Sequence, residues 1–218
     1  MNLPEEIQFL AIEGVIGVGK SSLSAMIAER LGAQLLLEEV EENPFLGKFY
    51  SNREAYAFQV QLFFLLSRHK QFYETFAQRD LFSSCVVGDY VFDKDRIFAS
   101  INLSRDEMAM YDKVAQTLAK EIVKPDFVVY LQANIETLLE RIKKRGRAWE
   151  MKMDREYLEE LIEAYNHYFF HVVECPVLIV NTDNIDFVEK EDDLKDLLNV
   201  IESFPKGTTY YSPTSLTL

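Results

Sequence analysis

The stretch Gly14-Val15-Ile16-Gly17-Val18-Gly19-Lys20-Ser21 decides the fold, because it matches the pattern G-x-x-x-x-G-K-S. It follows an apolar strand-like run at 7–12 and opens a run with helical periodicity at 20–31. In that context the pattern is typical of a loop that binds phosphate, because glycines bring backbone N–H groups close to phosphate oxygens and the helix start adds positive charge. We predict that Lys20 reaches the outer phosphates of a nucleotide and that the Ser21 hydroxyl ligates Mg²⁺. The predicted phosphate-binding residues are Gly14, Gly17, Val18, Gly19, Lys20, Ser21 and Ser22.

Apolar strand-like runs alternate with longer helical patterns over the rest of the chain. Further strands are predicted at 35–37, 85–87, 127–131 and 177–180, and helices at 52–79, 103–123, 135–144, 155–173 and 189–204. Short apolar strands separated by helices predict a parallel sheet that is covered on both faces. We therefore expect one doubly wound α/β domain over residues 1–205, with about five parallel strands. Residues 206–218 are rich in Gly, Pro, Ser and Thr, which predicts a loose C-terminal tail.

Length and composition narrow the class of protein. The 218 residues are 48% hydrophobic and 27% charged, which suits one globular domain. Lys and Arg number 23 against 36 Asp and Glu, and the net charge of −13 argues against binding to nucleic acid or a membrane surface. The two cysteines exclude a disulfide scaffold, the N-terminal residues predict no secretory signal, and no apolar run reaches the ~20 residues that a membrane span needs. These features predict a cytoplasmic protein.

Two motifs of GTP switches are missing. A guanine-binding N-K-x-D should follow a late strand, but Asn181-Thr182-Asp183 has no lysine. A D-x-x-G should follow the third strand, but no glycine follows in Asp89-Tyr90-Val91-Phe92. Both absences favour a kinase of a small molecule over a GTP switch.

The densest basic cluster of this acidic chain is Arg141-Ile142-Lys143-Lys144-Arg145-Gly146-Arg147. Arg141 and Arg145 lie four residues apart, on one face of the predicted helix, and Gly146 lets the chain turn before Arg147. Kinases of small substrates need a mobile cationic lid over the transferred phosphoryl group. We predict that the three arginines form this lid. The plainer alternative is a solvated basic helix end that balances the helix dipole.

The order of these motifs resembles the deoxyribonucleoside kinase family. The resemblance extends over about residues 7–180 and rests on the phosphate loop, the arginine-rich stretch and several further anchors. These anchors are Leu66-Ser67-Arg68, Asp95-Arg96-Ile97-Phe98-Ala99-Ser100 and Tyr130-Leu131-Gln132-Ala133. Asn43-Pro44-Phe45-Leu46 is similar to the bacterial deoxyadenosine and deoxyguanosine kinase branch. The resemblance implies ATP and Mg²⁺ as cofactors and a homodimer.

The resemblance also implies roles for individual residues. Glu38 matches the carboxylate that takes the proton from the sugar 5′-hydroxyl, and it follows a strand whose carboxyl end faces the ligand crevice. Tyr50 matches the tyrosine that meets the 3′-hydroxyl, and Glu150 matches its carboxylate partner. Gln61 and Arg68, two turns apart on one helix face, match the glutamine and arginine that read the base.

One departure from the family leaves the choice of proton acceptor open. The family often has Glu-Arg-Ser or Asp-Arg-Ser after the third strand, with the arginine at the 5′-oxygen, whereas this chain has Gly88-Asp89-Tyr90. Asp89 could be the base in place of Glu38 or could help to bind Mg²⁺. Glu39, Glu41 and Glu42 widen the choice further.

Two residues that contact the base are chosen from residues that lie close together in the sequence. Either Asp93 or Asp95 matches the aspartate that reads the base, and Asp95 is preferred because Arg96 and residues 97–99 follow it. Phe92 is the preferred ring for stacking on the base, because it lies beside both aspartates in the sequence.

We therefore expect ATP-dependent phosphorylation of the 5′-hydroxyl of a deoxyribonucleoside, with a purine favoured and deoxycytidine as a further candidate. A thymidylate-type nucleoside monophosphate kinase is the alternative enzyme, although residues 38–42 are acidic and would repel an acceptor phosphate. A nucleotide-binding regulatory module without turnover is the alternative from another class.

Overall fold

A single parallel sheet of six strands forms the centre of the protein, in a computed structural model that describes residues 1–77, 85–204 and 206–213. The strands are β1 (Phe9–Gly14), β2 (Gln34–Leu36), β3 (Val86–Gly88), β4 (Phe127–Gln132), β5 (Val177–Asn181) and β6 (Thr208–Tyr211). They lie in the order β2-β3-β1-β4-β5-β6, and every neighbouring pair is parallel. The predicted doubly wound α/β fold is confirmed.

The sixth strand corrects the expectation of a loose tail beyond residue 205. β6 pairs with β5, with Val177 opposite Thr208 and Val180 opposite Tyr211. Its four residues are threonine and tyrosine, which favour a strand, and the preceding helix supplies the crossover that a parallel edge strand needs. The surrounding Gly, Ser and Pro concealed this short segment. Residues 205 and 214–218 lie outside the described part of the chain.

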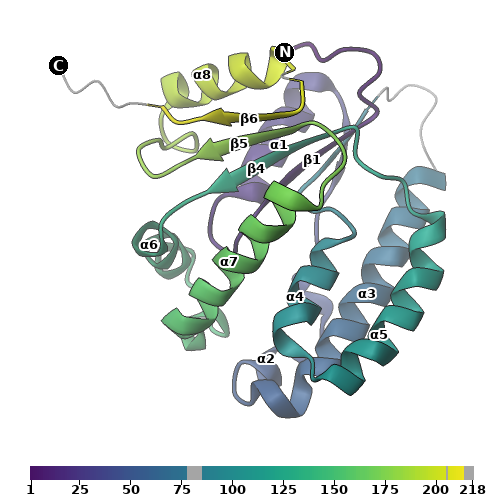
Figure 1. The fold of residues 1–218 in the computed structure, drawn as a ribbon. Coiled ribbons are helices and arrows are strands. Elements are labelled where there is room, and N and C mark those ends of the chain that lie inside the picture. Colours follow the sequence, from purple (N-terminus) through teal and green to yellow (C-terminus); the bar gives the residue numbers. More distant parts are fainter. Residues whose placement is uncertain (78–84, 205, 214–218) are drawn as a thin grey trace.

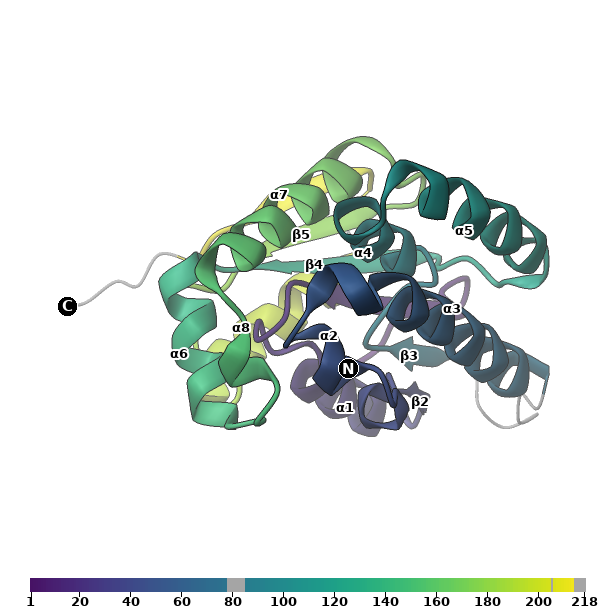
Figure 2. The ribbon, with the colours of Figure 1, turned by 90° about the horizontal axis from the view of Figure 1, so that it is seen from below.

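Helices cover both faces of the sheet (Figures 1 and 2). One face carries α1 (Lys20–Leu31) and α8 (Glu191–Glu202); the other carries α3 (Arg53–Ala77), α4 (Lys94–Asn102) and α7 (Arg155–His171). α5 (Arg105–Leu118) packs outside α3 and α4. The remaining elements are α2 (Leu46–Phe49), α6 (Ile135–Arg145) and 3-10 turns at Val40–Glu42, Ala119–Glu121 and Glu150–Lys152. None of the helices in the described ranges has the length and apolar character that crossing a membrane requires.

Aromatic contacts fix α3 and α7 against the sheet. The ring of Phe9 on β1 lies 5.7 Å from that of Phe72 and 5.2 Å from that of Phe76, both on α3. The ring of Tyr130 on β4 stacks on that of Phe169 on α7 at 4.5 Å. Such pairs add directional attraction to the burial of apolar area, so both helices have a defined position over the strands.

Local signals in the sequence set the helix ends that matter for the site. The Asn134 side chain accepts a hydrogen bond from the Thr137 N–H and caps the start of α6. Gly146 ends α6 in the left-handed region at φ 71°, where a side chain would be strained. The predicted helix at 52–79 begins at Arg53, and the part beyond Ala77 lies outside the described residues. α4 is a helix that the sequence pattern did not predict, because it has only nine residues and no side-chain cap.

Candidate active site

The phosphate loop connects β1 to α1 and requires glycine. At Gly14 a Cβ atom would lie 2.4 Å from the Leu131 carbonyl oxygen, and at Gly19, with φ 109°, it would lie 2.8 Å from the Phe187 ring. The Nζ atom of Lys20 donates to the carbonyl oxygens of Gly14 at 2.7 Å and Val15 at 3.2 Å, so the ammonium group is held over the loop. Partial burial and the nearby Lys94 lower the pKa of Lys20 to about 8.

Two cavities meet at this loop. The first, the nucleotide cavity, is lined by Gly17, Val18, Gly19, Lys20, Ser21, Ser22, Arg141, Lys144, Arg145, Arg147 and residues 185–189. The second, the acceptor cavity, measures about 790 Å³ with the space open to solvent, and its lining includes Glu38, Tyr50, Gln61, Phe64, Arg68, Asp89, Lys94, Phe98, Trp149 and Glu150. Lys20, Ser21, Arg145 and Arg147 line both cavities, so these residues mark the place where they join.

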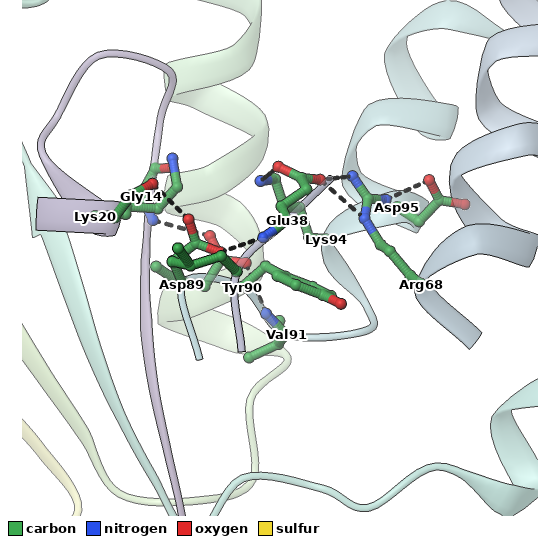
Figure 3. Close-up of polar contacts among 12 residues, drawn as sticks. Gly14, Lys20, Glu38, Arg68, Asp89, Tyr90, Val91, Lys94 and Asp95 are labelled. Carbon is green, nitrogen blue, oxygen red and sulfur yellow. Dashed lines mark hydrogen bonds and ion pairs between the residues drawn. The ribbon is translucent and has the colours of Figure 1, made fainter. Parts of the chain in front are cut away.

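A chain of ion pairs crosses the acceptor cavity (Figure 3). Oε1 of Glu38 accepts from Nε of Arg68 at 3.0 Å and also from its Nη2, while Oε2 accepts from Nζ of Lys94 at 2.5 Å. Nη1 of Arg68 donates to Asp95, whose other oxygen accepts from the Tyr111 hydroxyl at 2.8 Å. The structure thus joins three residues named from the sequence, Glu38, Arg68 and Asp95, in one network.

The pKa values of two acids in this network are shifted in opposite directions. Burial would raise the pKa of Glu38, but Lys94 and Arg68 outweigh it and hold that pKa well below the usual range. Burial raises the pKa of Asp95 to about 6, against the opposing effects of Arg68 and the Tyr111 hydrogen bond. Glu38 is therefore ionised at neutral pH and ready to accept a hydrogen bond.

Asp89 occupies a different place from Glu38 in the same cavity. Its Oδ2 accepts a hydrogen bond from the Ser21 hydroxyl at 2.5 Å, and its Oδ1 accepts from the Glu38 backbone N–H at 2.9 Å. A hydroxyl and a carboxylate side by side are hard oxygen donors, which suit a Mg²⁺ ion that takes its remaining ligands from phosphates and water. The described residues contain no cluster of three His, Cys, Asp or Glu that could hold a metal by themselves.

The arginine-rich stretch divides into two parts. Arg145 forms a two-pronged ion pair with Glu150, with Nε–Oε2 and Nη2–Oε1 distances of 3.0 and 2.5 Å, and Arg147 lies between Glu41 and Glu150. Arg141 instead donates to the Val18 and Ile185 carbonyl oxygens and to two oxygen atoms of Thr182, at 2.9 to 3.3 Å. These contacts tie α6 to the phosphate loop and to residues 182–185, and Arg141 also lines the nucleotide cavity.

Tyr50, Gln61 and Glu150, all named from the sequence, line the acceptor cavity. Gln61 is 2% exposed, and its Oε1 atom has no hydrogen-bond partner among the described residues. A buried acceptor without a partner costs about 1–3 kcal/mol, and a ligand that donates to it removes this cost. Burial raises the pKa of Tyr50 well above its ordinary value, so its hydroxyl keeps its proton and can donate.

The structure does not bring Phe92, the ring named for stacking on the base, to the acceptor cavity. Phe92 is buried with its ring edge against Phe72 at 6.1 Å and does not line the acceptor cavity. The rings of Phe64 and Phe98 line it instead. The turn at residues 91–94 leaves Phe92 in the core, whereas Phe98 lies one turn into α4.

Three further residues of the site were missed in the sequence. Lys94 pairs with Glu38, and Trp149 lines the acceptor cavity with its indole N–H buried and without a partner among the described residues. Glu13 is fully buried and accepts from the backbone N–H groups of Gly14 and Val91, both at 2.9 Å. Burial raises the pKa of Glu13 despite Lys94 and Lys20. A charged residue inside an apolar strand was the signal for Glu13, whereas Lys94 and Trp149 carried no signal.

A phosphate loop at the carboxyl edge of a doubly wound sheet, joined to an acceptor cavity with an ionised carboxylate, defines a kinase of a small acceptor. The profile of the deoxynucleoside kinase family matches residues 10–206. The deoxyguanosine kinase of Bacillus subtilis (strain 168) is 39% identical over 191 residues, which are 86% of this chain and 92% of the relative. The deoxyadenosine/deoxycytidine kinase of the same strain is 32% identical over 204 residues, which are 89% and 91% of the two chains.

A solved structure of a deoxynucleoside kinase has a fold similar to that of this chain. The deoxyadenosine kinase from M. mycoides with bound dATP aligns with a TM-score of 0.75 at 27% identity, over 89% of this chain and 98% of that chain. This chain belongs to the deoxynucleoside kinase family. The predicted family, fold and kinase activity are confirmed, and neither the monophosphate kinase nor the regulatory module is retained.

Proposed function

We propose that the protein transfers the γ-phosphoryl group of ATP to the 5′-hydroxyl of a purine deoxynucleoside in nucleotide salvage, with deoxycytidine as a second substrate. The observation that carries the proposal is the junction of the two cavities at Lys20, Ser21, Arg145 and Arg147. The names of the relatives, which act on deoxyguanosine, deoxyadenosine and deoxycytidine, support the choice of substrates. The homodimer and the cytoplasmic location remain predictions.

Glu38 acts as the base in this scheme. Its carboxylate accepts the proton of the 5′-hydroxyl while the 5′-oxygen forms a bond to the γ-phosphorus. The bond from the γ-phosphorus to its bridging oxygen breaks, and ADP leaves with that electron pair. Lys20, Arg145 and Arg147 stabilise the charge on the moving phosphoryl group. Mg²⁺, which Ser21 and Asp89 would help to hold, neutralises phosphate charge when it is bound.

The other end of the acceptor cavity reads the base and the sugar. We assign the unpartnered Oε1 of Gln61 to a donor on the base and the Arg68 guanidinium to an acceptor on it, with Asp95 as the anion that orients Arg68. Phe64 and Phe98 supply apolar ring surface. Tyr50 and Glu150 bind the 3′-hydroxyl.

A substrate panel tests the function. The protein is incubated with ATP, Mg²⁺ and each of the four deoxynucleosides, and products are identified by mass. We expect 5′-monophosphates of deoxyguanosine and deoxyadenosine, with kcat/KM at least about tenfold above that for thymidine, because a site that pairs a base rejects one that leaves its polar groups unpaired. Thymidine as the best substrate would contradict the purine preference. ATP binding without any phosphorylated nucleoside would contradict the proposed function as a whole.

A second prediction concerns the choice of sugar. A site that pairs the 3′-hydroxyl leaves buried polar groups unpaired when that hydroxyl is missing, so 2′,3′-dideoxynucleosides should have kcat/KM about tenfold or more below deoxynucleosides. Tyr50→Phe should reduce this ratio, because one of the groups that require the hydroxyl is removed. Tyr56→Phe, on α3 and outside the lining of the cavity, is the control and should leave the ratio unchanged. A ratio unaltered by Tyr50→Phe would remove Tyr50 from the site.

A further inference from the structure

Lys94 is a buried cation at the centre of the acceptor cavity. It is the first residue of α4, is 4% exposed and lines the cavity together with Lys20, Glu38 and Asp89. Among the described residues, its ammonium group makes one side-chain hydrogen bond, to Oε2 of Glu38 at 2.5 Å (Figure 3). An ammonium group has three donors, so Lys94 can hold Glu38 and still face the cavity.

Fold stability does not account for a lysine at this position. Burial of an ammonium group has a large desolvation penalty, and an ion pair repays it only in part. The start of a helix carries partial positive charge, which disfavours a cation in the first turn. A methionine would fill similar space without either penalty. The placement of Lys94 is therefore explained by two carboxylates rather than by apolar packing: Glu38, to which it donates, and the fully buried Glu13 nearby.

The two oxygens of Glu38 have different partners. Arg68 holds Oε1, and Lys94 holds Oε2. Arg68 also pairs with Asp95 and shares the cavity wall with Gln61, so a bound base that engages its guanidinium weakens its hold on Oε1. Oε1 then becomes available to the acceptor hydroxyl. Lys94 remains to fix the carboxylate through Oε2.

Residue 90 is a tyrosine, so it supplies no second cation that could hold Glu38 in place of Lys94. Tyr90 follows Asp89, and its hydroxyl donates to the Gln71 side chain at 2.7 Å. Its ring is fully buried and lies outside the lining of the acceptor cavity. In this part of the site, Lys94 is thus placed to hold Glu38 during transfer.

We propose that Lys94 is the positioning residue of this kinase, whose ammonium group holds Oε2 of Glu38 so that Oε1 meets the acceptor hydroxyl of the nucleoside. The inference rests on the role proposed above for Glu38. In this inference Lys94 acts through Glu38 and not on the nucleotide. The phosphates of the nucleotide meet Lys20, Arg145 and Arg147 instead.

The first test replaces the charge and keeps the shape. Lys94→Met should lower kcat about 10²–10³-fold, the scale for loss of one group that acts in the transition state, while KM for ATP changes less than about threefold. Lys94→Arg should recover at least about a tenth of the wild-type kcat, because the charge is restored. Arg96→Met removes an exposed cation from the same helix, and its kcat should stay within about twofold of wild type. A Lys94→Met enzyme with near-normal kcat, or a Lys94→Arg enzyme no better than Lys94→Met, would overturn the proposal.

A double-mutant cycle separates positioning from direct contact with substrate. If Lys94 acts through Glu38, then Glu38→Gln with Lys94→Met should have the same kcat as Glu38→Gln. The double variant carries no unpaired ammonium group, so it remains informative if Lys94→Met folds poorly. A further loss of about tenfold in the double variant would contradict an action through Glu38. Wild-type protein without turnover on any deoxynucleoside would reject the proposed function, whereas active wild type with an unaffected Lys94→Met enzyme would reject this inference alone.

Discussion

Lys20→Ala should abolish turnover and leave the fold intact. The ammonium group of Lys20 lies where the two cavities join, so it faces the charge that develops as the phosphoryl group moves. Interactions made mainly in the transition state appear in kcat, and we expect a loss of about 10³-fold or more. The two hydrogen bonds from Nζ go to the carbonyl oxygens of Gly14 and Val15, and their loss should cost on the order of 1–3 kcal/mol of folding free energy, which leaves a stable domain folded.

Steady-state kinetics with ATP and the best deoxynucleoside, together with thermal unfolding, check this result. Lys143→Ala is the matched control, because Lys143 is an exposed lysine of α6 outside the lining of both cavities. Its kcat should stay within about twofold of wild type. A Lys20→Ala enzyme with near-normal kcat would remove the phosphate loop from the mechanism.

The sequence was most informative where local chemistry and spacing coincide. The phosphate loop could be predicted because glycines, a lysine and a hydroxyl must follow one another directly between a strand and a helix. Gln61 and Arg68 could be placed on one helix face because their helix is long and regular. The fold followed from apolar strands that alternate with helical patterns. These features depend on neighbours in the chain, which a single sequence contains.

The sequence was uninformative where contacts between distant segments determine what a side chain faces. Arg141 has the spacing of a lid residue, and that spacing could not show that its partners Val18, Thr182 and Ile185 come from other loops. Phe92 and Phe98 are both aromatic residues near Asp95, and only the turn before α4 determines which ring faces the cavity. Lys94 looks like an ordinary surface lysine in the sequence, because its partner Glu38 is 56 residues away. The sequence pattern did not predict the short helix α4, so it could not show in which direction the side chains of that helix point.

The two candidate bases can be told apart by substitutions that keep shape. Glu38→Gln should lower kcat by about 10²–10⁴-fold, because an amide cannot accept the proton of the hydroxyl. Asp89→Asn should act mainly on the metal, since its carboxylate accepts from the hydroxyl of Ser21, the residue predicted to ligate Mg²⁺. We therefore expect added Mg²⁺ to recover much of the activity of Asp89→Asn and none of that of Glu38→Gln.

The measurement is kcat for both variants over a range of Mg²⁺ concentrations at fixed ATP and deoxynucleoside. Glu39→Gln is the matched control, because this neighbouring acid lies outside the lining of the acceptor cavity, and its kcat should match wild type. If Asp89→Asn loses far more kcat than Glu38→Gln at every Mg²⁺ concentration, the two roles are exchanged. Glu38 would then be an anion that orients Arg68 and Lys94, and the proton of the acceptor hydroxyl would pass to Asp89, which shares the cavity and lies beside the phosphate loop.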